Sequence, residues 1–283
     1  MYSLITNRLM EEYNINISVT ELQSLGDTHL SDHVLSKIRE CREYFTELSE
    51  SLEVVDSISN PTGIYKYVKK YSRQNGTHYY YDFETDKDKK RVITEEQRNN
   101  LGEFKRSKYA YSHYTPNDPN EYVIVITDHL SLLQTEAGAS TLHESMTRMS
   151  AEYARKNITK HFKYVFVGIQ QQSSDKEKLQ FTNTGSSIDQ KLEPSLDGLG
   201  DNKLTQRDAL VILGLFAPDR YGIKQHLGYN VSKLRDNYRC LIVLKNRIGK
   251  PNLKLGLYFN GMTNYFEELP SIMTDQNYEN YKK

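Results

Sequence analysis

Two runs of β-branched and aromatic residues constrain the fold of this chain more than any other feature. They read Tyr122-Val123-Ile124-Val125-Ile126-Thr127 and Tyr164-Val165-Phe166-Val167-Gly168-Ile169. Unbroken apolar runs of this length are typical of strands that a parallel sheet buries on both faces. An amphipathic helical pattern over residues 141–160 separates the two runs. The order strand, helix, strand indicates an α/β fold.

Two more strands are expected downstream, at residues 209–216 and 240–244. The apolar segments 253–259 and 265–269 flank Asn260-Gly261-Met262-Thr263-Asn264, a spacing that predicts a β-hairpin. The sequence therefore predicts an α/β domain with a mostly parallel sheet flanked by helices and a C-terminal β-hairpin. Ligands of such sheets bind at the carboxyl ends of the strands.

Four segments of the chain differ in character. Residues 1–71 are predicted to be helical, with apolar residues three and four apart, Ser31 as an N-cap and a short strand at 52–55. Residues 72–119 hold few aliphatic residues, many charges and Tyr79-Tyr80-Tyr81, which predicts an insertion that is partly β-hairpin and partly loop. Residues 120–270 carry the buried strands, and 271–283 are expected to form a flexible tail.

Composition narrows the class of protein. The 37 basic and 37 acidic residues cancel, so overall charge does not point to nucleic acid or to an anionic membrane. Two cysteines, Cys41 and Cys240, are too few for a disulfide framework or a zinc cluster. No apolar run approaches the ~20 residues of a membrane span, so we expect a cytoplasmic protein without a membrane partner. With 22 Tyr and no Trp, the composition resembles that of proteins encoded by AT-rich genomes. The genome of a phage that infects bacteria would suit this composition.

Polar side chains follow the two buried strands directly. Asp128 comes after the first strand, where a carboxylate can bind Mg²⁺ directly or through water, or can simply cap a turn. Gln170 follows the second strand, where an amide can contact a phosphate oxygen, or can simply begin a polar loop. His129, His143 and His161 lack the spacing of metal ligands and are interpreted as structural.

A basic segment follows the strand at 240–244. Lys245 and Arg247 stand two residues apart on an extended segment, so their side chains are expected on the same side. The window 233–254 holds seven basic residues and one acidic residue. This segment is either an anion-binding pair or a solvated basic edge of the sheet.

Taken in order, these segments resemble the motor domain of hexameric replicative DNA helicases of the DnaB type, a superfamily 4 family with a RecA-like core. The Walker B element of that family is matched by VIVITDHLSLL, with Asp128, and its second strand with a terminal Gln by YVFVGIQQQ, with Gln170. Its Lys-x-Arg-x-Gly segment and hairpin are matched by LIVLKNRIGKPNLKLGLYFNGMTNYFEEL, the most specific of the three. The resemblance covers about residues 1–270 apart from the insertion.

The family's phosphate-binding loop has no counterpart, since G-x-x-x-x-G-K-[ST] occurs nowhere in the chain. In the family, that loop and the strand that ends in the catalytic Glu precede the helix that resembles the start of this chain. The resemblance implies that the first strands of the core and the Walker A part are missing. We expect that these parts are encoded on a separate chain, have been truncated or have been lost. The chain alone is expected to be inactive.

The resemblance also implies roles for individual residues. ATP and Mg²⁺ are the implied cofactors, with Asp128 as the Walker B acid, Gln170 as the γ-phosphate sensor, and Lys245 and Arg247 as fingers that act on the nucleotide of a neighbouring subunit. Single-stranded DNA and a homo-hexameric ring are the implied partners. The DNA-contacting residues implied by the family's loop are Asp197, Gly198, Gly200, Lys203 and Arg207.

The resemblance favours a 5′–3′ replicative DNA helicase. Two alternatives remain. One is a non-catalytic RecA-like module, such as a helicase loader or a recombination mediator, and the other is a different α/β enzyme that binds a phosphorylated ligand at Lys245 and Arg247.

Overall fold

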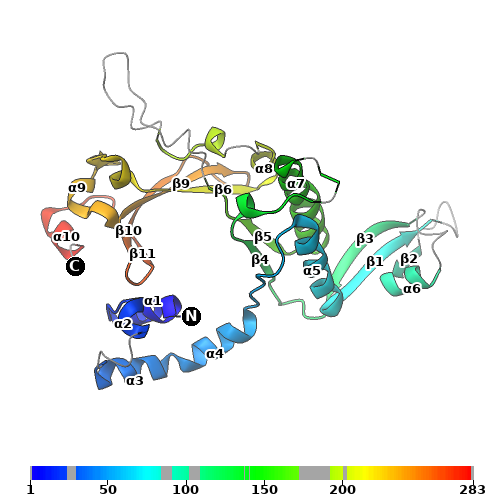
Figure 1. Ribbon diagram of the computed structural model, residues 1–283, viewed down its shortest axis with the longest axis horizontal. Helices are drawn as coiled ribbons and strands as arrows, with labels where there is room; N and C mark the ends of the chain where they lie inside the picture. The colour runs from blue at the N-terminus through cyan, green and yellow to red at the C-terminus, as the bar shows by residue number, and fades with distance from the viewer. Residues whose placement is uncertain are drawn as a thin grey trace, which may run out of the picture. The chain divides into compact units, whose positions relative to one another are not determined.

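The computed structural model describes residues 2–23, 30–83, 91–101, 109–136, 138–139, 141–171, 192–199 and 203–281. The chain divides into two compact units (Figure 1). The central unit comprises Asp56–Ser173 and Leu196–Ala209, and the terminal unit comprises Met1–Val55, Ser174–Ser195 and Leu210–Lys283.

A pair of parallel strands lies at the centre of the central unit. In this pair β4 (Ile124–Thr127) runs beside β5 (Val165–Gly168), with Ile124 opposite Val165 and Thr127 opposite Gly168. These are the two β-branched runs of the sequence, and both strands are confirmed. The helices of the unit outside the insertion are α5 (Pro61–Gln74), α7 (Leu142–Arg148), the π-helix η3 (Met149–His161) and α8 (Lys203–Asp208), with the 3₁₀ turns η2 (Leu130–Leu132) and η6 (Leu196–Gly198).

Helix η3 continues α7 and packs against α5 through a shared apolar core. Ile158 and Phe162 of this region are buried, together with Val68 of α5 and Tyr164. The start of α5 is defined by its sequence, because Pro61 occupies the first turn and the Asn60 side chain accepts from the Gly63 N–H at 2.7 Å.

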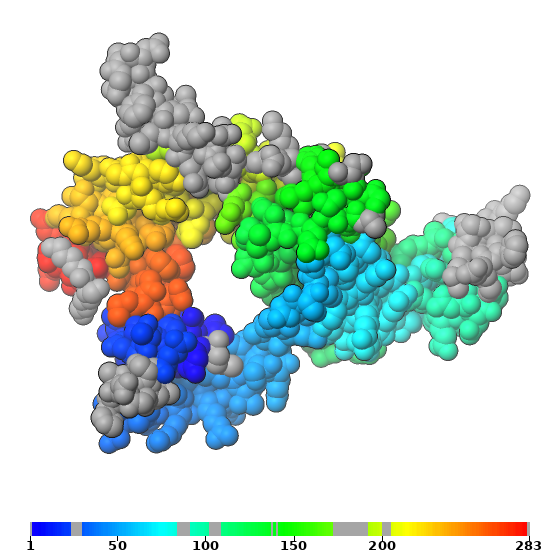
Figure 2. All heavy atoms as spheres, in the orientation of Figure 1, coloured from blue at the N-terminus to red at the C-terminus, as the bar shows by residue number. Residues whose placement is uncertain are grey.

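The insertion forms a sheet of its own within the central unit. Its strands are β1 (Gly76–Asp82), β2 (Arg91–Thr94) and β3 (Tyr109–Pro116), which pair antiparallel in the order β2-β1-β3, and α6 (Glu95–Asn100) follows β2. This sheet extends away from the helices around β4 and β5 (Figure 1), and in Figure 2 the cyan and teal atoms of the insertion project beyond the green atoms of the unit. The sequence predicted a hairpin and a loop, and the third strand was not predicted. The three strand segments contain few aliphatic residues, and residues 84–90 and 102–108 separate them in the sequence.

A four-stranded antiparallel sheet forms the terminal unit's core. Its strands are β6 (Val211–Phe216), β9 (Tyr238–Asn246), β10 (Lys254–Asn260) and β11 (Tyr265–Glu268), in the order β11-β10-β9-β6. Alternate residues of β9, namely Tyr238, Cys240 and Ile242, are buried on one face. The β10–β11 pair occupies the place of the expected hairpin.

Shorter elements complete the terminal unit. At the N-terminus these are α1 (Tyr2–Tyr13), α2 (Val19–Gln23), α3 (Asp32–Glu40) and α4 (Arg42–Ser51). The others are η7 (Pro218–Tyr221), β7 (Gln225–His226), β8 (Tyr229–Asn230), α9 (Val231–Leu234), η8 (Arg235–Asn237) and α10 (Asp275–Asn280). Ser31 caps α3 as predicted, its hydroxyl accepting from the Val34 N–H at 3.4 Å. None of the described helices is long and apolar enough to cross a membrane.

Three expectations from the sequence were wrong. The sheet is not mostly parallel among the described strands, because β4 with β5 is the one parallel pair and β6, β9, β10 and β11 all pair antiparallel. No strand forms at 52–55, where Val54 is 81% exposed. The tail at 271–281 is not without structure, because α10 places Tyr278 in the core at 6% exposure and the Tyr278 hydroxyl accepts from the Asn230 N–H at 2.8 Å.

Candidate functional site

Asp128 lies at the carboxyl end of β4 with an exposed side chain. The chain around it is held to the end of β5, because the Ile169 N–H donates to the Thr127 carbonyl at 3.0 Å and the Leu130 N–H donates to the Ile169 carbonyl at 2.9 Å. The peptide bond between Asp128 and His129 is cis. The structure thus presents one carboxylate to solvent at the edge where α/β sheets bind ligands.

Gln170 lies at the same edge, two residues after β5, and both ends of its amide are bonded. Its Nε2 donates to the Leu199 carbonyl, and the Thr205 hydroxyl donates to its Oε1 at 3.3 Å. Leu199 directly follows η6, and Thr205 lies in α8. The amide therefore joins the end of β5 to the segment that was predicted to contact DNA.

Asp208 anchors the last turn of α8 to η3. Its carboxylate is 3% exposed and accepts from the Ser150 hydroxyl at 3.0 Å and from Arg155 Nη1 at 3.0 Å. Asp208 was not predicted as a functional residue, and no local signal marks it, because its partners are 53 and 58 residues away in the chain. The bonds of Gln170 and Asp208 together fix α8 at its middle and its end.

The residues that were predicted to contact DNA belong to this anchored segment, which runs from η6 to the end of α8. Asp197 and Gly198 belong to η6, where Asp197 is exposed and Gly198 is buried. Lys203 is the first residue of α8, and the Arg207 side chain is 62% exposed with its Nε 3.6 Å from Asp208 Oδ1. Gly200 lies outside the described residues.

Lys245 and Arg247 lie in the terminal unit, at the end of β9. Lys245 is opposite Ile212 in the sheet, and the Arg247 N–H donates to the Leu210 carbonyl at 3.0 Å. The turn that follows is held by Asn246, whose Oδ1 accepts from the Ile248 and Gly249 N–H groups at 3.0 and 2.9 Å. The basic pair therefore sits on a hydrogen-bonded strand end with an ordered turn.

The four residues predicted as catalytic fall into two pairs. Asp128 and Gln170 lie together at one sheet edge of the central unit, whereas Lys245 and Arg247 belong to the terminal unit. Within the described ranges, no group of three or more His, Cys, Asp and Glu side chains could hold a metal ion. A single carboxylate still fits Mg²⁺, because this ion keeps several waters and takes its remaining ligands from substrate phosphates.

Of the three histidines that were interpreted as structural, His129 and His161 are partly buried and His143 is exposed. His161 stacks on Tyr111, with ring centroids 4.1 Å apart, and its pKa is lowered by burial and by neighbouring lysines. The Nδ1 atom of His129 is buried without a hydrogen-bond partner among the described atoms. His143 is exposed in the first turn of α7.

Comparisons with known proteins bear on the fold. No protein-family model matches the chain, and no curated protein matches it in sequence. Among solved structures, the chain is similar to a DnaB-like replicative helicase whose interactions with primase are described with its structure. The TM-score is 0.59, the sequence identity is 16%, and the match covers 95% of this chain. That match covers 48% of the helicase, so the chain spans about half of its length.

A second solved structure agrees with the first. It is an ATPase domain, with a TM-score of 0.59 and 16% identity, and the match covers 95% of this chain and 69% of the other. Both similarities extend over nearly all of the chain, which confirms the resemblance to DnaB-type helicases at the level of the fold. The chain has the fold of a DnaB-type helicase.

Proposed function

We propose that this chain is a subunit of a DnaB-type replicative DNA helicase, a ring of six subunits that unwinds duplex DNA in the 5′–3′ direction with ATP. One observation carries the proposal. Asp128 and Gln170 lie at the carboxyl ends of adjacent parallel strands, and the Gln170 amide is bonded to the segment that leads into α8. These bonds support the proposal, because they link the edge proposed to sense the nucleotide to the segment proposed to contact DNA. The proposal implies a cytoplasmic protein, in a bacterium or in a phage-infected cell.

The residues at this edge have complementary tasks in the proposal. Asp128 holds Mg²⁺, directly or through water, and the ion neutralises charge on the phosphates of ATP when it is bound. Gln170 can offer its amide to a phosphate only by giving up its bonds to Leu199 and Thr205. If the Gln170 amide turned to a phosphate, the Leu199 carbonyl would lose its hydrogen-bond donor, which costs free energy for a buried or half-buried group. Phosphate binding would therefore shift the segment around Leu199.

The DNA contact in this proposal is made by cations and backbone groups. Arg207 is exposed and can pair with a phosphate, and Lys203 lies one turn before it in α8. Asp197 carries the wrong charge for a phosphate contact, so its contribution, like those of Gly198 and Gly200, would come from the backbone. Such contacts suit unwinding, which does not depend on base sequence.

Lys245 and Arg247 act in trans in the proposal. They stabilise negative charge on the γ-phosphate bound by the neighbouring subunit, as an arginine finger does. The bonds of Leu210 to the Arg247 backbone and of Asn246 to the following turn support this role, because a finger must be held in position by its own subunit.

ATP hydrolysis in this proposal also needs a phosphate-binding loop from outside these 283 residues, since none of them forms G-x-x-x-x-G-K-[ST]. The central unit offers a surface for a segment that carries such a loop. Four side chains on one face of β4 and β5, those of Ile124, Ile126, Val165 and Val167, are between 41% and 62% exposed. Parallel strands are ordinarily covered on both faces.

The test is ATP hydrolysis by this chain mixed with a polypeptide that carries the phosphate-binding loop, with and without single-stranded DNA. The DNA upstream of the Met1 codon is the first place to seek such a polypeptide. Arg247→Ala should lower the hydrolysis rate by roughly 10³-fold or more, while nucleotide binding changes little. Lys250→Ala removes a cation from the same turn and serves as the control.

The outcome separates the finger role from a binding role. Equal losses of binding and hydrolysis in Arg247→Ala would contradict the finger role, as would an equal loss in Lys250→Ala. Hydrolysis that does not respond to single-stranded DNA would count against the helicase.

A non-catalytic RecA-like module, such as a helicase loader or recombination mediator, is the second candidate. The missing phosphate-loop motif favours it. This candidate predicts a stable monomer without ATPase activity in any mixture, so the same assay distinguishes it from the helicase.

A further inference from the structure

A cavity of about 460 Å³ lies in the central unit, at the junction of the insertion with the helices. Its walls include Tyr65 and Lys69 of α5, Tyr80 of β1, Tyr111 of β3, and Lys156 and His161 of η3. Pockets for small organic ligands commonly measure ~300–1,000 Å³, so the volume suits a ligand of nucleotide size. The strand ends that carry Asp128 and Gln170 contribute nothing to its walls among the described residues.

The pocket is positively charged. Two ammonium groups line it, Lys69 and Lys156, and no acidic residue lines it in the part of the chain that the structure describes. Helix α5 carries four basic residues and no acidic residue. Burial, followed by the charges of Lys156, Lys160 and Lys163, lowers the pKa of His161, as expected at a wall with positive potential.

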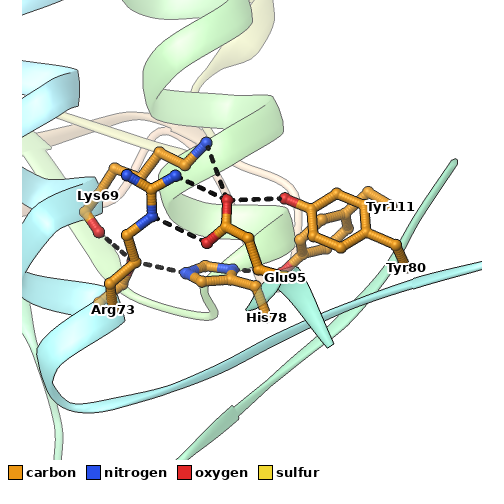
Figure 3. Close-up of polar contacts among 7 residues, drawn as sticks. Lys69, Arg73, His78, Tyr80, Glu95 and Tyr111 are labelled. Atoms are coloured by element: carbon orange, nitrogen blue, oxygen red, sulfur yellow. Dashed lines mark hydrogen bonds and ion pairs between the residues drawn. The ribbon is translucent and has the colours of Figure 1, made fainter. Parts of the chain in front are cut away.

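The carboxylate beside Lys69 is already paired with an arginine. Glu95 of α6 accepts from Arg73 Nε at 2.8 Å and from Arg73 Nη2 at 2.7 Å, a bidentate pair (Figure 3). Lys69 Nζ lies 3.9 Å from the same carboxylate, beyond hydrogen-bond distance. Because Arg73 satisfies both oxygens of Glu95, the ammonium of Lys69 keeps most of its capacity for another anion.

Aromatic rings with fixed positions form most of the rest of the wall. Tyr111 stacks on His161 at 4.1 Å and donates to the His161 carbonyl at 3.1 Å. Tyr65 stacks on Tyr153 at 4.7 Å with an interplanar angle of 5°. His78, which is 2% exposed, also lines the pocket and is held by a hydrogen bond to Ser72 at 2.8 Å. Rings already held in place lose little entropy when a further ring packs against them.

We propose that this pocket binds a nucleotide unit, with its phosphate on Lys69 and Lys156 and its base against the tyrosine rings. Fixed aromatic rings beside ammonium groups are the combination that binds the bases and the backbone of single-stranded nucleic acid. The same chemistry would accept a free nucleoside monophosphate. The site is formed by α5, η3 and the insertion, so it stands whether or not the chain hydrolyses ATP.

The test measures binding to the full chain by fluorescence anisotropy of a labelled oligothymidylate. Thymidine 5′-monophosphate, thymidine and inorganic phosphate serve as competitors. Lys69→Ala with Lys156→Ala should weaken binding at least about tenfold, since each removes a hydrogen bond to a charged group. Lys66→Ala with Lys70→Ala removes two exposed charges from α5 away from the pocket, and should change binding by less than about threefold.

The competitors identify the source of the nucleotide. Competition by thymidine 5′-monophosphate supports a free nucleoside phosphate as a ligand, and binding of the oligonucleotide without such competition supports a strand. A photoreactive 4-thiothymidine oligonucleotide should crosslink to the peptides that hold Tyr65 or Tyr111. Crosslinks confined to the segment around Arg207 would assign the binding to the DNA-contacting segment of the proposed helicase and would overturn the pocket.

Three other outcomes also overturn the proposal. They are equal losses in the two double variants, inorganic phosphate competing as well as thymidine 5′-monophosphate, and no binding of any probe. Lys69→Gln with Lys156→Gln, which removes both charges but keeps most of the length of the side chains, replaces the alanine pair if circular dichroism shows that the latter is unfolded.

Discussion

Asp208 ties α8 to η3, and replacing it should loosen the segment that Gln170 links to the strand edge. Asp208→Ala removes hydrogen bonds from the Ser150 hydroxyl and from Arg155 Nη1, both at 3.0 Å. Hydrogen bonds to a charged group contribute roughly 1.5–3 kcal/mol each. The Arg155 side chain is 53% exposed and returns to water when its partner is lost, so its bond belongs at or below the low end of this range.

The free energy of unfolding should therefore fall by about 2–4 kcal/mol in Asp208→Ala. At about 2–4 °C per kcal/mol, the melting temperature should fall by roughly 5–15 °C. Urea denaturation and calorimetry measure both quantities, and hydrogen exchange should show faster exchange of the amides of α8. Asp197→Ala, which removes an exposed carboxylate from the same segment, should change stability by less than about 0.5 kcal/mol.

A double-mutant cycle with Arg155→Ala isolates the ion pair from other effects of the substitution. Arg155→Ala alone should cost less than Asp208→Ala, because it leaves the carboxylate with the Ser150 hydroxyl. A cost of Asp208→Ala below about 0.5 kcal/mol, or unchanged exchange in α8, would refute the anchoring role.

Two further predictions concern stability in the two units. Burial lowers the pKa of His78 to about 4, so the unfolded chain binds more protons than the folded chain between about pH 6.5 and 4, and stability should fall by about 2–3 kcal/mol as the pH falls through this window. His78→Phe should flatten that dependence in urea titrations at pH 7 and 4.5, and an unchanged slope would contradict the assignment. In the terminal unit, Tyr278→Ala should cost about 3–5 kcal/mol, as truncation of a buried aromatic side chain does. The exposed Tyr122 provides a matched control, and equal effects of the two substitutions on the urea midpoint would show that α10 does not belong to the core.

The two parallel strands of the central unit were predictable because their signal is local. The β-branched runs at 122–127 and 164–169 contain β4 and β5, and Asp128 and Gln170 follow those strands in the chain itself. Their placement at one edge then follows from the parallel pairing. The cap of α3 by Ser31 was predictable for the same reason.

Strand direction was not predictable in the terminal unit. The apolar runs of β6 and β9 resemble those of β4 and β5 in composition, yet β6 and β9 pair antiparallel. A strand's own residues do not set the direction of its partner, since the hydrogen bonds of either arrangement use the same backbone groups. The connection through η7, α9 and η8 returns the chain in the opposite direction.

The partners of the functional side chains were also beyond the reach of the sequence. Gln170 contacts Leu199 and Thr205, which lie 29 and 35 residues further along. The cavity between Tyr65, Tyr111 and Lys156 draws on three segments, one of which was predicted to be hairpin and loop. Contacts across such distances depend on how helices and sheets pack, and no local pattern records them.

Residues 271–281 show both sides of this division. Thr274 and Asn277 form a capping box within four residues, which is a signal that the sequence itself contains. The burial of Tyr278 depends instead on Asn230 and Lys233, more than 40 residues earlier. Strands, caps and the order of polar residues at strand ends thus follow from neighbours in the chain. Pairing direction, the anchoring of α8 and the basic aromatic pocket arise from packing between distant segments, because burial and hydrogen-bond partners come from residues that meet only in the folded chain.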